Sequence, residues 1–390
     1  MVPGFKAAAV ASGLKKDPVL DLALILSEKE ATAAGVFTTN RVKAAPVLLS
    51  MDRVRKGRAR AIVANAGNAN ACTGKEGLER ARATTALVAS ELGIGEEEVL
   101  VGSTGVIGQP LDMDRIRPAV PELARILSAE GIPAASRAIM TTDSFPKISR
   151  FDGKAGGTPY RIVGMAKGAG MIMPHMATML AFILSDIQID GHGLKSALQN
   201  SVESTFNRIT VDGDTSTNDT VLVLANGMAG NGALDEADME TFTRGLRQVM
   251  AALARMIVQD GEGATKVIQV RVRGAAGAAD ALNAARTVAN SSLVKTAFYG
   301  EDPNWGRIMA ALGRSGIMMD EKRVDLWIDD AQIVSGGLGK GAEAEKLAAR
   351  NMKEKAFTLT IELHQGNFED TVITCDLTHD YVSINADYRS

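Results

Sequence analysis

Residues 167–182 read KGAGMIMPHMATMLAF, a glycine- and methionine-rich loop that runs directly into a strand-like apolar segment. The loop ends in Ala177-Thr178, and a cut between these two residues would make Thr178 a new N-terminus. The hydroxyl group of Thr178 would then be a nucleophile, and the freed α-amine would be the base that activates it. An α-amine titrates near about 7.7–8.0, well below a lysine, so it can accept this proton at neutral pH. The stretch therefore makes Thr178 a candidate nucleophile, on condition that the chain is cut before it.

The alternative is a threonine that simply opens a buried strand, because β-branched residues favour strands. Three features weaken this alternative. The glycines permit the strained turn that attack on a peptide carbonyl requires, Ala177 is small, and Lys167 lies eleven residues before Thr178. Lys167 would lower the pKa of the freed amine by like-charge repulsion, or would bind a substrate carboxylate. A solvated loop lysine is the alternative for Lys167.

The composition excludes several classes of partner. The 390 residues are 46% hydrophobic and 23% charged with a net charge of -3, and they contain no long run of like charge. This balance predicts no nucleic-acid partner. No apolar stretch approaches the roughly 20 residues of a membrane span, and the N-terminus has no signal-peptide pattern. Cys72 and Cys375 lie far apart, and the four histidines lack metal-ligand spacing. We therefore expect a cytoplasmic protein without a metal.

Short β-like runs alternate with amphipathic helical segments, which predicts an α/β fold. The expected strands are 61–64, 99–101, 180–189, 220–224 and 267–272, and the expected helices are 76–92, 113–130, 191–206, 235–260 and 276–290. The last fifth contains four β-rich runs, at 324–328, 356–363, 368–375 and 381–385. Their alternating pattern predicts a mixed or antiparallel sheet in a smaller C-terminal lobe from about residue 320.

The turn around Thr104-Gly105 follows one of these expected strands. Acyl transfer builds negative charge on the former carbonyl oxygen, so it requires hydrogen-bond donors at that position. A Thr-Gly turn can supply a hydroxyl and a backbone N–H together. An ordinary strand-to-helix turn with a left-handed glycine is the alternative.

Three further residues are candidates for binding or proton transfer. Glu262 is flanked by glycines after an expected helix and could bind an ammonium group, although a plain loop is the alternative. Asn385 is an amide suited to a small polar ligand, although it lies near a terminus that can fray. His175 precedes Thr178 by three residues and could be a base, although a loop histidine with a satisfied hydrogen bond is the simpler interpretation. No nucleotide-binding glycine motif is present, since residues 336–341 lack P-loop spacing and no dinucleotide fingerprint follows a strand.

Several stretches together resemble one family along almost the whole chain. The segment 167–180 is similar to the self-cleavage and nucleophile motif of the ornithine acetyltransferase family. Other stretches that resemble this family in order and spacing are Asn65–Gly74, Ser103–Gly108, Thr141-Thr142-Asp143, Asp260–Lys266 and Gly300–Arg307.

The resemblance implies a self-processing, N-terminal-nucleophile-like α/β sandwich with a smaller β-rich C-terminal lobe. The chain would cut itself into an alpha chain, 1–177, and a beta chain, 178–390, and two of each would form a heterotetramer. The oxyanion pair of the family falls on Thr104 and Gly105. Its substrate contacts fall on Thr141, Lys167, Thr178, Glu262, Asn385 and Ser390. The family often has threonine at the last position, and Ser390 keeps the hydroxyl group.

The resemblance also implies the reaction. Thr178 would take the acetyl group from N2-acetyl-L-ornithine, release L-ornithine, and pass the acetyl group to L-glutamate, a route in arginine biosynthesis that needs no cofactor. Acetyl-CoA as a further donor stays open. Two rival hypotheses remain: an amidase or aminopeptidase that uses the same cut threonine, and a non-enzymatic amino-acid-binding protein in which Thr178 stays in mid-chain.

Overall fold

The computed structural model describes residues 1–16, 18–173 and 179–386, and the chain divides into two compact units. The first unit comprises Met1–Asn207 and Asp214–Ile257, and the smaller second unit comprises Arg208–Gly213 and Val258–Ser390. The proposed cut between Ala177 and Thr178 lies outside the described residues.

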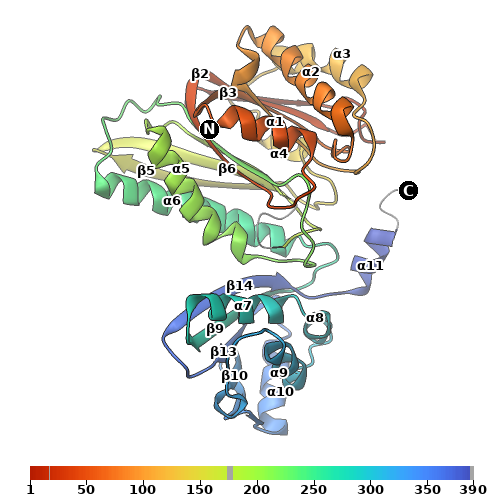
Figure 1. The fold of residues 1–390 in the computed structure, drawn as a ribbon, viewed down its shortest axis with the longest axis vertical. Coiled ribbons are helices and arrows are strands. Elements are labelled where there is room, and N and C mark those ends of the chain that lie inside the picture. The colour runs from red at the N-terminus through yellow and green to blue at the C-terminus, as the bar shows by residue number, and fades with distance from the viewer. Residues whose placement is uncertain (17, 174–178, 387–390) are drawn as a thin grey trace. The chain divides into compact units, whose positions relative to one another are not determined.

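The first unit contains one mixed sheet of eight strands and six α-helices in its described residues (Figure 1). The strands are β1 (Phe5–Val10), β2 (Leu22–Phe37), β3 (Arg58–Asn65), β4 (Val99–Ser103), β5 (Lys147–Ala155), β6 (Thr158–Lys167), β7 (Leu180–Ser185) and β8 (Thr220–Ala225). The helices are α1 (Ala45–Val54), α2 (Gly74–Leu92), α3 (Met113–Arg125), α4 (Ile132–Ala138), α5 (Gly191–Glu203) and α6 (Glu236–Gln259). The strand order is β4-β3-β2-β8-β7-β6-β5, with β1 paired to β2.

The long strand β2 belongs to both halves of this sheet. Its first part pairs with β3, its last part pairs with β8, and its register with β3 shifts between Leu26 and Ala31. The two halves face each other across one apolar core, which includes Ile62 and Leu100 from one half and Leu180 and Phe182 from the other. At Gly102 in β4, an added Cβ would lie 3.3 Å from the Phe182 ring, so β4 stacks over β7.

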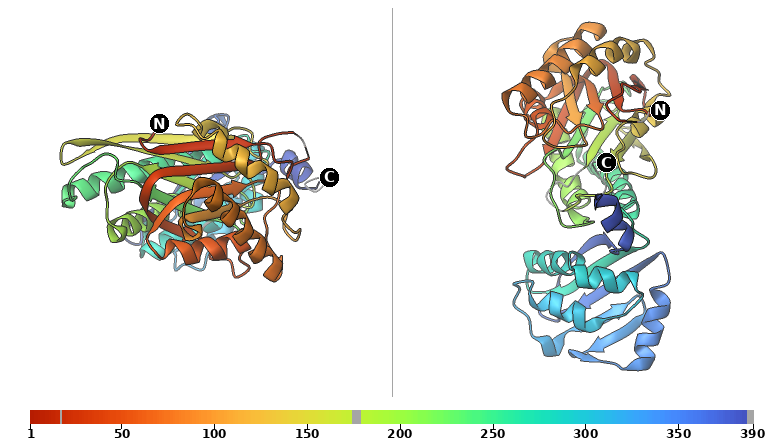
Figure 2. Two further views of the ribbon diagram at one scale, coloured as in Figure 1. Left: turned by 90° about the horizontal axis from the view of Figure 1, so that it is seen from above. Right: turned by 90° about the vertical axis from the view of Figure 1, so that its right-hand side faces the viewer.

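Helices cover the outer faces of both halves. A second core joins β3 and β4 to α1, α2 and α3. On the other half, Gly164 in β6 leaves room for α6, because an added Cβ there would lie 2.8 Å from Val249 Cγ1. The unit is therefore layered as helix, sheet, sheet and helix, which confirms the expected α/β sandwich (Figure 2).

The second unit is built on a six-stranded sheet in the order β12-β11-β10-β13-β9-β14. Its strands are β9 (Val267–Ala275), β10 (Asp325–Ile328), β11 (Ala331–Ser335), β12 (Leu338–Gly339), β13 (Ala356–Glu362) and β14 (Phe368–Cys375). Its helices are α7 (Ala278–Ala289), α8 (Ser292–Tyr299), α9 (Trp305–Gly313), α10 (Ala342–Asn351) and α11 (His379–Ala386). Among the strands that the structure describes in this unit, β13 and β9 pair in parallel and the other pairs are antiparallel, so the expected mixed sheet is confirmed. The main segment of this unit already begins at Val258, upstream of residue 320, because β9 lies inside this sheet between β13 and β14.

The expected strand at 381–385 is wrong, because these residues lie in the helix α11. Side chains satisfy carbonyls one turn back: Ser383 Oγ donates to His379 O at 3.4 Å, and Asn385 Nδ2 donates to Tyr381 O at 3.0 Å. Among the described residues, the sheet of this unit ends at β14, and none of its strands pairs with the segment 381–385. Without such a partner, period-two alternation does not make a strand.

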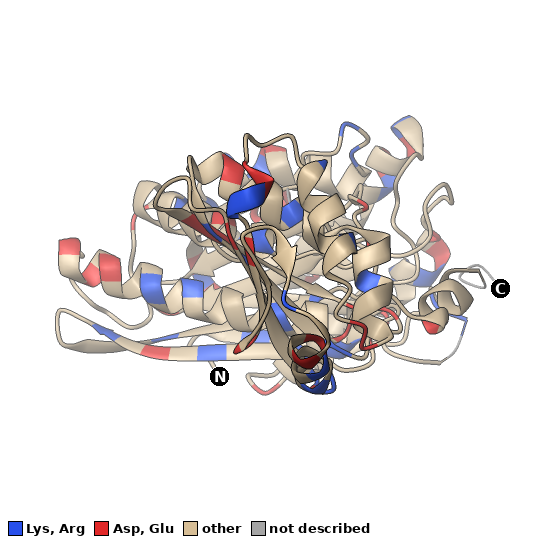
Figure 3. Cartoon of the chain, turned by 90° about the horizontal axis from the view of Figure 1, so that it is seen from below, with Lys and Arg blue, Asp and Glu red and all other residues tan. Residues whose placement is uncertain are grey.

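Acidic and basic residues are interspersed along the elements (Figure 3). Within the described ranges, no helix combines the length and the apolar character needed to cross a membrane. The same ranges hold no cluster of three or more His, Cys, Asp or Glu side chains suited to a metal ion.

Candidate active site

Lys167, the last residue of β6, contacts two of the other predicted site residues. Its side chain is 3% exposed. Its Nζ lies 2.8 Å from Thr141 Oγ1 and 3.4 Å from Thr104 Oγ1. The predicted oxyanion turn after β4 therefore meets the end of β6 at one buried ammonium group, which rules out the solvated loop lysine.

The Thr104-Gly105 turn is fixed by the neighbouring loop. Thr104 N donates to Asn65 O at 2.9 Å, and Val106 N donates to Gly67 O at 3.3 Å. Gly105 has a φ of 131°, and an added Cβ would lie 2.3 Å from the carbonyl carbon of Gly67. This position accepts only glycine, both for its backbone conformation and for the close approach of the chain.

A buried ion pair next to Lys167 was not assigned from the sequence. The side chains of Asp143 and Lys147 are both 0% exposed, and Lys147 Nζ lies 2.7 Å from Asp143 Oδ1. Lys167 Nζ lies 3.7 Å from Asp143 Oδ2. Asp143 also accepts hydrogen bonds from Thr141 N at 3.0 Å and Gly168 N at 2.7 Å. Burial alone would raise the pKa of Asp143, but Lys167, Lys147 and these hydrogen bonds hold it well below its usual range.

A second buried acid, Asp219, also escaped the sequence-based interpretation. Its Oδ1 accepts a hydrogen bond of 2.9 Å from the backbone N–H of Met179, the residue after Thr178 in the chain. Burial raises the pKa of Asp219 well above its usual range, although the Met179 and Thr38 hydrogen bonds and the Lys167 charge oppose this. Next to it in the chain, Asn218 Nδ2 donates to Ser103 O at 2.9 Å, which ties the start of β8 to the end of β4. Both residues lie in the segment 216–220, whose polar and β-branched composition does not distinguish it from an ordinary turn.

The second unit brings together two other predicted residues. Asn385 Nδ2 in α11 donates to Glu262 Oε2 at 2.8 Å, although 123 residues separate them. Glu262 is 9% exposed, and it precedes Gly263, whose φ is 69°. The carboxylate is therefore held in a tight turn with one amide donor against it.

Four of the residues singled out from the sequence lie outside the described residues: Ala177, Thr178, Ser390 and the neighbouring His175. Of the remaining site residues, Thr104, Gly105, Thr141 and Lys167 belong to the first unit, and Glu262 and Asn385 belong to the second.

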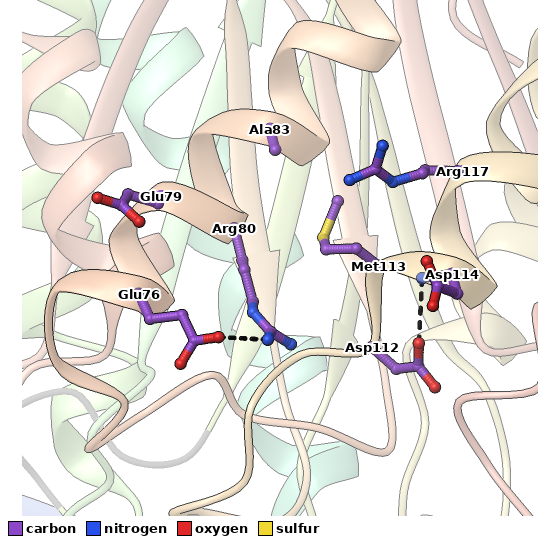
Figure 4. A pocket seen from close by; sticks show the side chains of 8 residues that line it. All are labelled: Glu76, Glu79, Arg80, Ala83, Asp112, Met113, Asp114 and Arg117. Carbon is purple, nitrogen blue, oxygen red and sulfur yellow. Dashed lines mark hydrogen bonds and ion pairs between the residues drawn. The ribbon is translucent and has the colours of Figure 1, made fainter.

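The first unit also carries surface pockets. One of about 410 Å³ lies between α2 and α3, and Arg80 donates to Glu76 at its wall (Figure 4). Another of about 420 Å³ is lined by Gly67 and Asn68, which pack against the oxyanion turn, and by Lys15, Lys16 and Arg115. Arg115 is paired there with Asp112 at 3.0 Å.

A family model and curated relatives match this chain along nearly its whole length. A family model described as "ArgJ family" matches residues 6–390. The chain is similar to "Arginine biosynthesis bifunctional protein ArgJ" of Geobacter sulfurreducens, with 52% identity over 391 residues and 100% of both chains covered. It is similar to "Glutamate N-acetyltransferase" of Methanocaldococcus jannaschii, with 46% identity, covering 99% of this chain and 97% of that one.

Among solved structures, the chain is similar to the ornithine acetyltransferase of Mycobacterium tuberculosis complexed with ornithine. The identity is 38%, the match covers 46% of this chain and 94% of that one, and the TM-score is 0.40.

Proposed function

This chain is a member of the ArgJ family, and on that premise we propose that it transfers the acetyl group of N2-acetyl-L-ornithine to L-glutamate. It is an acetyltransferase of arginine biosynthesis, as the names of its relatives state for those proteins. The products are L-ornithine and N-acetyl-L-glutamate.

The reaction proceeds in two displacements. The neutral α-amine of Thr178 takes the proton of the Thr178 hydroxyl group, whose oxygen attacks the acetyl carbonyl carbon. The Thr104 hydroxyl group and the Gly105 N–H donate to the oxygen that becomes negative. The carbon–nitrogen bond breaks, the leaving amine takes the proton, and ornithine departs. The amine of glutamate then attacks the acetyl-threonine ester and leaves as N-acetylglutamate, and the proton returns to the hydroxyl group.

The observation that carries this proposal is the meeting of Lys167, Thr104 and Thr141 at the ends of β6 and β4. A buried ammonium with two hydroxyl groups suits an α-carboxylate, which donor and acceptor amino acids share. Glu262 and Asn385 are the proposed contacts for the rest of the substrate, together with Ser390. A carboxylate such as Glu262 suits the side-chain ammonium group of ornithine.

We also propose the processing and the assembly. The chain cuts itself between Ala177 and Thr178, the two fragments remain one folded unit, and two such units form a heterotetramer in the cytoplasm. A denaturing gel tests the cut, because a single uncut band after prolonged incubation would remove the proposed nucleophile.

The transfer is tested by incubating the protein with acetylornithine and glutamate and following both acetylglutamate and free acetate. Acetylglutamate is the expected product, whereas free acetate alone would identify an amidase. Thr178→Ala should abolish both the cut and the transfer, and Thr178→Ser should keep part of each, because serine retains the hydroxyl group.

The reaction needs no metal or nucleotide cofactor, since the acetyl group moves from one amine to another. One observation favours acetyl-CoA as a further donor: Lys15 and Lys16 line the pocket beside the oxyanion turn, and such cations suit phosphate groups. Synthesis of acetylglutamate from acetyl-CoA and glutamate alone would establish this donor, and its absence would restrict the enzyme to acetylornithine.

A further inference from the structure

We propose that Asp143, anchored by Lys147, is the positioning residue that holds the Lys167 ammonium group in place and thereby orients the hydroxyl groups of Thr104 and Thr141. This inference rests on the proposed acetyl transfer and adds two residues to it. It concerns only residues of the first unit that the structure describes.

The first step is the charge of Lys167. Its side chain is 3% exposed, and a buried ammonium group is costly unless an opposite charge and hydrogen bonds compensate for the lost water. The carboxylate of Asp143, with Oδ2 at 3.7 Å from Lys167 Nζ, supplies that opposite charge. The low pKa of Asp143, which the two lysines cause against the opposing effect of burial, keeps the carboxylate ionised over the whole working range.

The second step is the direction of the hydroxyl groups. An ammonium group can only donate hydrogen bonds, so the oxygens of Thr104 and Thr141 accept from Lys167. Each hydroxyl hydrogen must then point away from the ammonium group. For Thr104, this leaves the hydrogen available to an oxyanion, and for Thr141 it leaves a donor available to the substrate. Lys167 thus acts on the reaction through the two threonines, and its position decides whether they are donors.

The third step is the role of Lys147. Its Nζ lies 2.7 Å from Asp143 Oδ1, which is shorter than the 3.7 Å between Lys167 and the same carboxylate. Lys147 is therefore the closer partner of the Asp143 carboxylate. Lys167 lies near enough to that carboxylate for charge compensation, and its Nζ still lies 2.8 Å from Thr141 Oγ1. Backbone donors from Thr141 and Gly168 fix the carboxylate further, so its orientation is determined from four directions.

The test compares Asp143→Asn with Asp186→Asn in the self-cleaved protein. Asp186 is a matched control, because it is also buried and accepts a backbone hydrogen bond, from Arg161 N at 2.7 Å. Leu180 at the start of β7 pairs with Lys167, whereas Asp186 follows the other end of that strand. About 20 Å of strand therefore separate Asp186 from Lys167. Both variants lose stability, but only Asp143→Asn removes the charge next to Lys167.

For Asp143→Asn we expect kcat for acetyl transfer to fall about 100-fold or more, the size of a lost oxyanion donor. The alkaline limb of the kcat/KM profile should move about 1–2 pH units lower, because Lys167 loses its proton more easily without the carboxylate. Asp186→Asn should keep the wild-type profile. An Asp143→Asn enzyme with the wild-type profile, or with a loss no larger than that of Asp186→Asn, would overturn the inference.

A second variant covers the case in which Asp143→Asn fails to fold. Lys147→Met removes the closest lysine of Asp143 and leaves Lys167, with Lys15 also in electrostatic range of the carboxylate, so we expect a lower kcat and an alkaline limb at higher pH. An unchanged kcat and profile in this variant would also overturn the inference. Failure of the proposed function is distinguishable, because the wild-type protein would then make no acetylglutamate, whereas failure of this inference leaves the wild-type transfer intact.

Discussion

Single positions in the first unit are constrained by contacts with residues far away in the sequence. Thr104 and Lys167 are 63 residues apart, and Thr141 and Lys167 are 26 apart. The motif containing Thr104 predicted an oxyanion turn, which stays a prediction, and the positive φ of Gly105 is the one that the ordinary-turn alternative also expects. Asp143 is also part of a stretch that stands out in the sequence, but its role depends on two lysines that only the fold brings to it.

Gly105→Ala should abolish transfer and destabilise the first unit by about 2–5 kcal/mol. Alanine would be strained by the positive φ, and its Cβ would also clash with the neighbouring backbone, so the two free-energy costs are summed. The added Cβ would lie 2.3 Å from the Gly67 carbonyl carbon. Gly108→Ala is the control, because Gly108 also has a positive φ, of 85°, but nothing lies within 4 Å of its added Cβ. It should cost only about 1–2 kcal/mol and keep activity. Thermal unfolding and transfer assays measure both, and equal effects would contradict the clash.

Asp143→Asn should also change the pH dependence of stability. A carboxylate with a lowered pKa in the folded state stabilises above its unfolded pKa of about 3.9, and this contribution is lost as the pH falls further. At pH 7 the variant should be less stable by about 3–5 kcal/mol, because a buried pair has lost one charge. The difference in Tm should shrink below about pH 4. A difference that stays constant between pH 7 and pH 3 would contradict the ion pair as its source.

At the scale of elements, most strands and helices follow their local pattern. The runs at 99–101, 220–224 and 267–272 form β4, β8 and β9, because apolar side chains in each can be buried against neighbouring elements. The segment 381–385 shows where a local pattern is insufficient, since the same alternation occurs in α11. Strand formation depends on a partner that supplies hydrogen bonds, and no local sequence reveals whether one is present.

Asn385 in helix α11 donates a hydrogen bond to Glu262, and from this contact we predict an effect on substrate affinity. Asn385→Asp would replace the amide donor with a carboxylate beside the Glu262 carboxylate. We expect KM for acetylornithine to rise about tenfold, equivalent to about 1.4 kcal/mol, with little change in kcat. Ser383→Ala on the same helix, which loses only a 3.4 Å bond to His379 O, should keep the wild-type KM. Equal KM values for the two variants would exclude Asn385 from the substrate contacts.

At the scale of the molecule, the position of the proposed cut relative to the strands decides whether the two fragments can separate. Residues 1–177 contain β1 to β6, and residues 178–390 contain β7 and β8. In the sheet, β8 and β7 lie between β2 and β6, so the second fragment is inserted into the first. Leu180, Phe182 and Leu222 from the second fragment share an apolar core with Ile62 and Leu100 from the first.

The two fragments should therefore remain together after cleavage. Separating them would break the β2–β8 and β6–β7 pairings and expose this core to water, at a cost of about 25 cal/mol per Å² of apolar surface. Gel filtration in native buffer should give one peak that contains both fragments, and a denaturing gel of that peak should separate them. Uncut Thr178→Ala should elute at the same volume. Two native peaks from the cleaved protein would contradict the shared sheet.

Some properties of this protein follow from short stretches of residues. The glycine-rich loop before Thr178, the Thr104-Gly105 turn and the α/β alternation are local patterns, and local chemistry and periodicity suffice to interpret them. Three features appear only in the tertiary structure. The strand β2 belongs to both halves of the sheet, β7 and β8 lie between β2 and β6, and the buried Asp143–Lys147 pair lies beside Lys167. They depend on strand pairing and burial between distant segments, and these energies belong to the contacts rather than to any one stretch.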